Sequence, residues 1–278
     1  MHERSSMELV DIGANLANSA FEGDREAVVA RAVEARVTKI IVTGTSLEIS
    51  SAAAELAQSS PELYATTGVH PHEASTWNSA SANRLRTLAK RPRVVAIGET
   101  GLDFYRNYAA REDQERAFAA QLDLAVELEL PVFLHEREAH NRQLEILTPY
   151  RRALRGAVAH CFTGTAQELD RYLSLDCYIG ITGWICDERR GLPLRKLVRR
   201  IPADRLLLET DAPYLLPRSM PPRPAGRRNE PSFLTHVLEM VAVCVERPTE
   251  EIAAATSANA NELFRFSDVV TRSTDDRD

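Results

Sequence analysis

The sequence has 278 residues, of which 44% are hydrophobic and 27% charged, the balance of an ordinary globular protein. Its formal net charge of −6 gives no reason to expect nucleic-acid binding, so any such binding must use a local basic patch. No apolar stretch reaches the roughly 20 residues of a membrane helix. No apolar signal segment opens the chain and the four cysteines have no C-x-x-C spacing, so we expect a cytoplasmic protein with reduced thiols.

Short apolar runs alternate with amphipathic segments along the whole chain. The runs cover residues 7–15, 39–46, 63–72, 93–103, 130–137, 156–164, 177–184 and 205–214. Between them, segments such as 24–36, 112–129 and 165–175 repeat apolar side chains every three or four positions, which predicts helices that bury one face. Eight strand–helix units predict a parallel sheet closed into a single (β/α)8 TIM barrel. An open doubly wound sheet is the alternative, but no G-x-G-x-x-G follows the first run.

The organisation predicted is one domain, residues 7–266. The polar ends predict a flexible N-terminal extension at 1–6 and a disordered C-terminal tail at 267–278. A segment rich in proline and arginine, residues 217–231, follows the last strand. We expect it to form a long loop over the mouth of the barrel.

Polar side chains gather where the predicted strands finish. The fourth run reaches Glu99, the fifth His135, the sixth His160 and the eighth Asp211. Each has an ordinary explanation when taken alone, such as a hydrogen-bonded histidine or a surface ion pair. The C-terminal ends of barrel strands meet at one face, however, and that face carries the active sites of such barrels. Imidazole and carboxylate groups together predict a site for a divalent cation.

Two neighbours of these residues are expected to point away from the site. Because side chains on a strand point alternately to opposite faces, Cys161 is expected to pack away from the site next to His160. Glu209 is expected to point away from Asp211 and to brace a neighbouring strand or a basic residue.

At these residues the chain resembles a known family. The segments GETGLDF, LHEREAH, AHCFTGT and ETDAPYLLPR are similar to the signature segments of the TatD family of metal-dependent deoxyribonucleases. DIGANL, TGVHPH and GITGWICDERRG extend the resemblance, over residues 7–266, toward the branch that gives the family its name. The resemblance implies an amidohydrolase-like barrel with 3′→5′ exonuclease activity on single-stranded DNA and RNA, in DNA repair or nucleic-acid degradation. It also implies a divalent metal, with Mg²⁺ expected first, Mn²⁺ next and Zn²⁺ least.

The family's ligand positions transfer to this chain with one departure. Glu99, His135 and His160 match its metal ligands, and Asp211 matches the aspartate that serves as ligand or general base. Most relatives also carry Asp-x-His-x-His on the first strand, whereas here the segment reads Asp-Ile-Gly-Ala-Asn from Asp11 to Asn15. The resemblance therefore leaves the number of metal ions open.

Further roles follow from phosphodiester chemistry, which needs a held backbone, a neutralised phosphate and an activated water. Asp211 is the candidate to take the proton from that water. His70 is a candidate donor to the phosphate or the leaving 3′-oxygen, or else a simple turn histidine. We assign substrate binding to four residues, in part as phosphate contacts. For the arginines of the loop after the last strand, the usual explanation is that they simply keep the loop solvated. The four are Asn15, Arg137, Arg227 and Arg228.

Two other functions remain open at this point. The barrel could hydrolyse another ester or amide, for example in a D-aminoacyl-tRNA, or it could be a metal-binding scaffold with little turnover. A monomer that uses no membrane is expected in each case.

Overall fold

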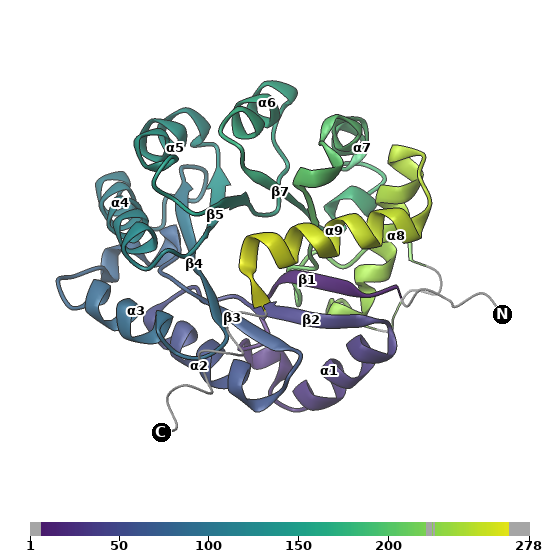
Figure 1. The fold of residues 1–278 in the computed structure, drawn as a ribbon, viewed down its shortest axis with the longest axis horizontal. Coiled ribbons are helices and arrows are strands. Elements are labelled where there is room, and N and C mark those ends of the chain that lie inside the picture. Colours follow the sequence, from purple (N-terminus) through teal and green to yellow (C-terminus); the bar gives the residue numbers. More distant parts are fainter. Residues whose placement is uncertain (1–6, 221–223, 225, 267–278) are drawn as a thin grey trace.

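A computed structural model describes residues 7–220, 224 and 226–266, so the predictions for 1–6 and 267–278 lie outside the described residues. Eight strands lie side by side in chain order, and each pairs in parallel with the next (Figure 1). They are β1 (Leu9–Ala14), β2 (Val37–Val42), β3 (Leu63–Thr67), β4 (Val94–Asp103), β5 (Val132–Arg137), β6 (Ala157–Ala159), β7 (Tyr178–Ile181) and β8 (Leu206–Leu208). The predicted TIM barrel is confirmed.

The barrel is closed by a seam in which side chains and loop backbone join β8 to β1. Beyond the end of β8, the Asp211 N–H donates to the carbonyl of Gly13 at 2.8 Å. The carboxylate of Asp11 accepts from the backbone N–H of Thr210 at 2.9 Å and from its hydroxyl at 2.5 Å. A short eighth strand therefore needs a buried carboxylate to complete its pairing.

Helices surround the strands on the outside of the barrel, except the last one, which lies across one end of it (Figure 1). They are α1 (Arg25–Glu34), α2 (Leu47–Ser59), α3 (Ser81–Ala89), α4 (Arg111–Glu127), α5 (His140–Leu147), α6 (Ala166–Ser174), α7 (Leu192–Leu197), α8 (Leu234–Val245) and α9 (Thr249–Phe264). The three helices predicted from periodicity correspond to α1, α4 and α6. In the part of the chain that the structure describes, no helix is long and apolar enough to cross a membrane.

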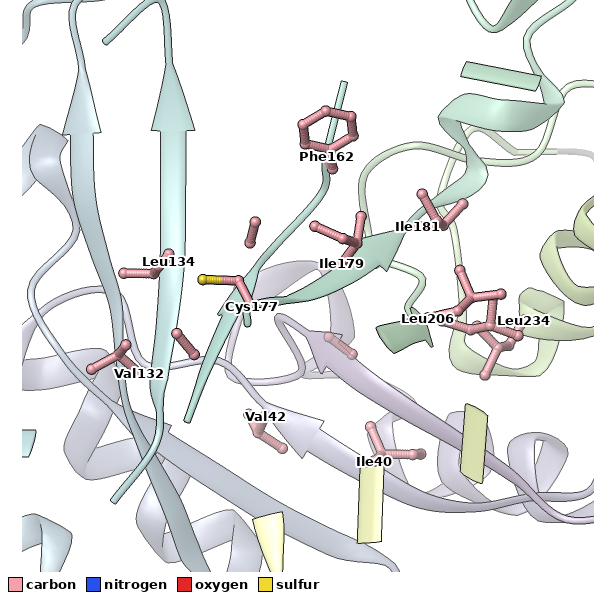
Figure 2. Close-up of a cluster of buried hydrophobic side chains, with 14 of the residues drawn as sticks. Ile40, Val42, Val132, Leu134, Phe162, Cys177, Ile179, Ile181, Leu206 and Leu234 are labelled. Carbon is pink, nitrogen blue, oxygen red and sulfur yellow. The ribbon is translucent and has the colours of Figure 1, made fainter. Parts of the chain in front are cut away.

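Side chains from the strands alternate between two apolar layers. Val132 and Leu134 of β5 face the helices with Ile179 of β7 (Figure 2), whereas Phe133, between the first two, lies in the inner cluster with Tyr178. This period-two pattern of inward and outward positions is what a barrel strand requires. It explains why the strands are apolar throughout instead of alternating with polar residues.

Helix α9 closes the N-terminal end of the barrel. Leu263 and Phe264 belong to the inner cluster, as does Phe266 beyond the helix, whose ring lies 4.5 Å from that of Tyr64. Asn259 on the same helix donates to the carbonyl of Leu206, the first residue of β8. With the strand starts covered in this way, the opposite end of the barrel is the end that opens to solvent.

Candidate active site

A pocket of about 550 Å³ opens at the C-terminal mouth of the barrel. Seven of the nine residues predicted for the site line this pocket: Asn15, His70, Glu99, His135, Arg137, His160 and Asp211. They come from the ends of different strands and the loops that follow them, which is the arrangement expected of a barrel active site.

Glu99 lies at the centre of this group. Its Oε1 is 2.8 Å from Nδ1 of His135, 3.3 Å from Nε2 of His70 and 3.8 Å from Nε2 of His160. Only 6% of Glu99 is exposed, so its carboxylate is almost fully removed from water. Three imidazole nitrogens therefore converge on one buried carboxylate oxygen.

Strand β4 holds Glu99 in place and continues past it. The strand extends to Asp103, so Glu99 lies inside it and not at its end as expected. Gly98 before it has a φ of 141°, and a Cβ there would clash with the carbonyl of Phe133. The Glu99 N–H donates to the carbonyl of Gly44 at 2.7 Å. A glycine and an irregular backbone thus bring the carboxylate inward.

Asp211 and His160 lie beside this cluster on the other side of the pocket. The amide of Asn15 donates to Oδ1 of Asp211 at 2.9 Å. Together with Cys161, these two residues place donor atoms within 4.8 Å of one another. The prediction that Cys161 packs away from the site was wrong, because the residue has a φ of 47° and does not continue the alternation of β6.

Glu209 also faces the site, contrary to the expectation that it points away. Its Oε2 lies 2.5 Å from Nδ1 of His160, and its Oε1 accepts from the backbone N–H of Cys161 at 2.6 Å. Residues two positions apart on a strand share a face, so alternation counted from Asp211 already places Glu209 on the side of the site, and the expectation misapplied that rule. A carboxylate that binds one nitrogen of a histidine fixes the ring and leaves the other nitrogen free for a metal ion.

Asp103 and His72 form a second arrangement of this kind that the sequence reasoning missed. Oδ2 of Asp103 is 2.7 Å from Nε2 of His72 and 3.5 Å from Nε2 of His135. That His135 nitrogen is buried and has no hydrogen-bond partner among the described residues. The second histidine of the GVHPH segment and the last acid of the fourth run were the available signals.

Burial and opposed charges shift the pKa values of these groups strongly. Burial opposes ionisation of Glu99, but its histidine neighbours outweigh burial and hold its pKa well below the ordinary value. Burial also opposes protonation of His160, yet Glu209 and Glu99 raise its pKa to about 10. The pKa of Asp211 rises to about 7, because burial outweighs the attraction of His160. Carboxylates gathered so closely attract positive charge.

The donor atoms fit a divalent cation. Asp103 lies beside Nε2 of His135 and Glu209 binds Nδ1 of His160, so the other nitrogen of each ring, which faces Glu99, is the one at which a cation could replace a proton. Ligand atoms of one ion bound at about 2.1 Å lie about 3 Å apart, close to the separations around Glu99. Glu99, His135 and His160 could hold such an ion, and Asp211, whose carboxylate lies within 4.8 Å of a His160 nitrogen, is a further candidate ligand.

Cys161 is a poor candidate ligand by comparison. Burial, with Asp211 and Glu209 close by, raises the pKa of its thiol well above the ordinary value. A thiol binds metal as the thiolate, so this environment disfavours metal binding at the sulfur.

The four predicted substrate-binding residues separate into two pairs. Asn15 and Arg137 line the pocket, and the guanidinium of Arg137 lies 3.9 Å from the ring centroid of Tyr105. Arg227 and Arg228 are not among its lining residues. Arg228 is held by Asp24 at 2.7 Å and Glu230 at 3.0 Å, so its charge is already neutralised within the fold.

The position of Gly13 explains why this chain lacks a histidine there. A Cβ on Gly13 would lie 2.8 Å from Oε2 of Glu209 and 3.0 Å from the ring of Phe133. No side chain fits between them without displacing the carboxylate that holds His160.

The closed barrel and the cluster of histidines and carboxylates at its mouth define the class of metal-dependent barrel hydrolases. The family model described as "TatD related DNase" matches residues 10–265, so the chain belongs to this family, which is metal-dependent.

Similar proteins span nearly the whole chain. The "3'-5' ssDNA/RNA exonuclease TatD" of Pantoea sp. is 56% identical over 93% of this chain and 100% of that protein. The Salmonella typhimurium protein of that name is 51% identical over 92% and 98%. The crystal structure of YJJV, a TatD homologue from Escherichia coli K12, has a TM-score of 0.85 and 32% identity, and the match covers 92% of this chain and 98% of that chain. A guanine deaminase from C. acetobutylicum, at 12% identity and a TM-score of 0.58, shares the fold alone.

Proposed function

We propose that this protein is a divalent-metal-dependent 3′→5′ exonuclease that hydrolyses phosphodiester bonds of single-stranded DNA and RNA. The observation that carries the proposal is the convergence of His70, His135 and His160 on Glu99, with Asp211 beside them, at the floor of an open pocket. Family membership and the names of relatives more than 50% identical support the same reaction. The cytoplasm and a role in DNA repair or nucleic-acid degradation are part of the proposal.

A bound divalent ion would neutralise the phosphate and activate a water. In our proposal Asp211 takes the proton from this water. Its oxygen is oriented by Asn15 at 2.9 Å, and its pKa of about 7 without a cation is close to what a base needs at neutral pH. A cation nearby would lower that pKa and keep the group ionised.

His70 is the proposed hydrogen-bond donor to the phosphate or the leaving 3′-oxygen. Burial lowers its pKa to about 4, so the ring is neutral at pH 7. Its Nδ1 accepts from the backbone N–H of His72 at 3.1 Å, which places the ring proton on Nε2. That nitrogen faces Glu99 at the floor of the pocket, and the tautomer makes His70 a donor and not a metal ligand.

We propose Mg²⁺ as the working ion, with Mn²⁺ as a substitute. Asp211, Glu99 and the amide of Asn15 are hard oxygen donors, which Mg²⁺ and Mn²⁺ prefer. Without first-strand histidines the chain offers fewer of the imidazoles that suit zinc. Exhaustive dialysis followed by metal analysis tests this: two zinc ions retained per chain, with full activity and no added Mg²⁺, would contradict it.

The reaction is tested with single-stranded oligonucleotides labelled at the 5′ end. We expect a ladder that shortens from the 3′ end in Mg²⁺ and that disappears with chelator or with a blocked 3′ end. Glu99→Ala should lose about 10²–10⁴-fold in rate while keeping a cooperative thermal unfolding transition. Internal cuts that dominate, or degradation unaffected by the 3′ block, would refute the exonuclease assignment.

A further inference from the structure

A second hollow adjoins the active-site pocket. It measures about 640 Å³ and is formed by the segment after β7 and the segment after β8. Trp184 and Leu215 line both hollows, so the two are continuous. We call it the arginine groove and define it by Trp184, Asp187, Arg189, Arg190, Arg218 and Arg227.

The arginine groove is positively charged in a protein whose net charge is −6. Four arginines and one aspartate among its described lining residues give it a net charge of +3. Arg190 and Arg227 are exposed, and neither forms an ion pair with any residue that the structure describes. The Arg190 guanidinium lies 5.9 Å from the ring centroid of Trp184, which places a cation beside an aromatic face at the junction with the pocket.

Asp187 shapes this groove from within. Its Oδ1 accepts from the backbone N–H groups of Arg189 and Arg190 at 2.8 and 3.1 Å, and its Oδ2 lies 3.2 Å from Nε of Arg218. Asp187 is 7% exposed, so it is largely covered by the groups it binds. One buried acid thus fixes a loop from which arginine side chains extend into solvent.

The other hollow beside the pocket has the opposite character. It lies next to Glu136 and Arg137, and its charged lining comprises Glu136, Glu138, Glu168, Arg137 and Lys196. These five side chains carry a net charge of −1, against +3 for those of the arginine groove. A polyanion that extends from the active site is therefore attracted more strongly to the arginine groove than to this side.

We propose that the arginine groove binds the single-stranded nucleic acid on the 5′ side of the scissile phosphodiester, with Trp184 stacking on a base at the junction. The inference rests on the proposed 3′→5′ activity, because that direction leaves the uncut strand on the 5′ side of the reacting bond. Arginines that neutralise backbone phosphates and an aromatic face that accepts any base are the features of sequence-independent single-strand binding.

The test compares kcat/KM for a dinucleotide, which spans only the reacting bond, with kcat/KM for a decanucleotide of the same base. For the wild-type protein we expect the longer substrate to be preferred. For the double variant Arg190→Ala/Arg227→Ala, this preference should fall on the order of tenfold at low salt, and the slope of log(kcat/KM) against log[salt] should flatten by about 0.7 for each lost contact. Lys196→Ala, which removes a cation from the other hollow, is the matched control.

The outcomes separate this inference from the proposed function. A wild-type protein that hydrolyses neither substrate refutes the proposed function. If both substrates are hydrolysed and the double variant keeps the length preference of the wild type, the arginine groove does not bind the strand, whereas the proposed nuclease function still holds. Loss of length preference in Lys196→Ala instead would place the strand in the other hollow. Thermal melts of each variant show whether the barrel is folded, and Trp184→Ala, which should also reduce the length preference, is an independent second variant.

Discussion

Glu209 contacts residues of the active site but does not line its pocket. It is completely buried, and it contacts His160 through one oxygen and the Cys161 backbone through the other. Two partners in fixed positions leave the carboxylate no freedom to rotate. It therefore holds the His160 ring so that Nε2 faces Glu99.

Replacing Glu209 with glutamine should weaken metal binding more than turnover at saturating metal. The amide oxygen can still accept from His160, but the amide nitrogen then faces the Cys161 N–H, and one donor is left unpaired. We expect the Mg²⁺ concentration for half-maximal rate to rise about 10–100-fold. Rates measured across a Mg²⁺ titration give this value, and Glu138→Gln, at an exposed acid, is the control. An unchanged titration would mean that Glu209 has no positioning role.

Gly13 should tolerate no side chain, although it lies on a strand where other residues are common. Alanine at this position would meet Glu209 at 2.8 Å and Phe133 at 3.0 Å, and such overpacking typically costs about 1–3 kcal/mol. Urea unfolding of Gly13→Ala measures this loss in the free energy of unfolding. Gly23→Ala is the matched control, because a Cβ there has no heavy atom within 4 Å. Equal stability of the two variants would contradict the clash.

At the scale of elements, the seam between β8 and β1 depends on the ionisation of one acid. Burial raises the pKa of Asp11 from 3.8 to about 7, even though Thr210 and Gly13 donate hydrogen bonds to it. The folded protein then binds this proton more tightly than the unfolded chain does. The resulting stabilisation is complete below pH 4 and is lost as the pH rises through about 7.

Asp11→Asn should remove this pH dependence. The asparagine amide can accept from the Thr210 N–H and donate to its hydroxyl, so the seam keeps its contacts. Between pH 5.5 and 8, the stability of the variant relative to wild type should rise by about 2 kcal/mol. Urea unfolding in metal-free buffer at both pH values measures the difference, with exposed Asp204→Asn as control. A relative stability that does not change with pH would show that Asp11 titrates normally.

The sequence predicted the elements better than it predicted the directions of side chains near their ends. Apolar runs and helical periodicity located the strands and identified α1, α4 and α6, since burial dictates both patterns. Strand alternation then gave the wrong face for Cys161, whereas Glu209 was assigned to the wrong face although residues two apart on a strand, such as Glu209 and Asp211, share one. Cys161 and Glu209 both follow strands that have already ended, and Cys161 and Asp211 have positive φ values of 47° and 55°. A rule based on extended backbone cannot hold where the backbone turns.

At the scale of the whole molecule, composition concealed the distribution of charge. The net charge of −6 gave no reason to expect a polyanionic substrate, yet Arg189, Arg190 and Arg218 gather beside the pocket. They come from two loops that the barrel brings together, and their proximity depends on the fold. Arg228, next to Arg227 in sequence, is instead bound by Asp24. Adjacent arginines therefore differ in role according to which acids the fold supplies.

Helix α9 closes one end of the barrel, so substrate and product must both pass through the open mouth at the other end. Phe264 and Phe266 fill the end of the barrel where the β-strands begin, so a nucleotide released at the proposed metal ligands must leave past the incoming nucleic-acid strand. The nucleic-acid strand can advance into the site only after this nucleotide has been released. Free nucleoside 5′-monophosphate should therefore inhibit competitively against a single-stranded oligonucleotide, raising KM without changing kcat in steady-state assays. Purely non-competitive inhibition would mean that product and strand occupy separate routes.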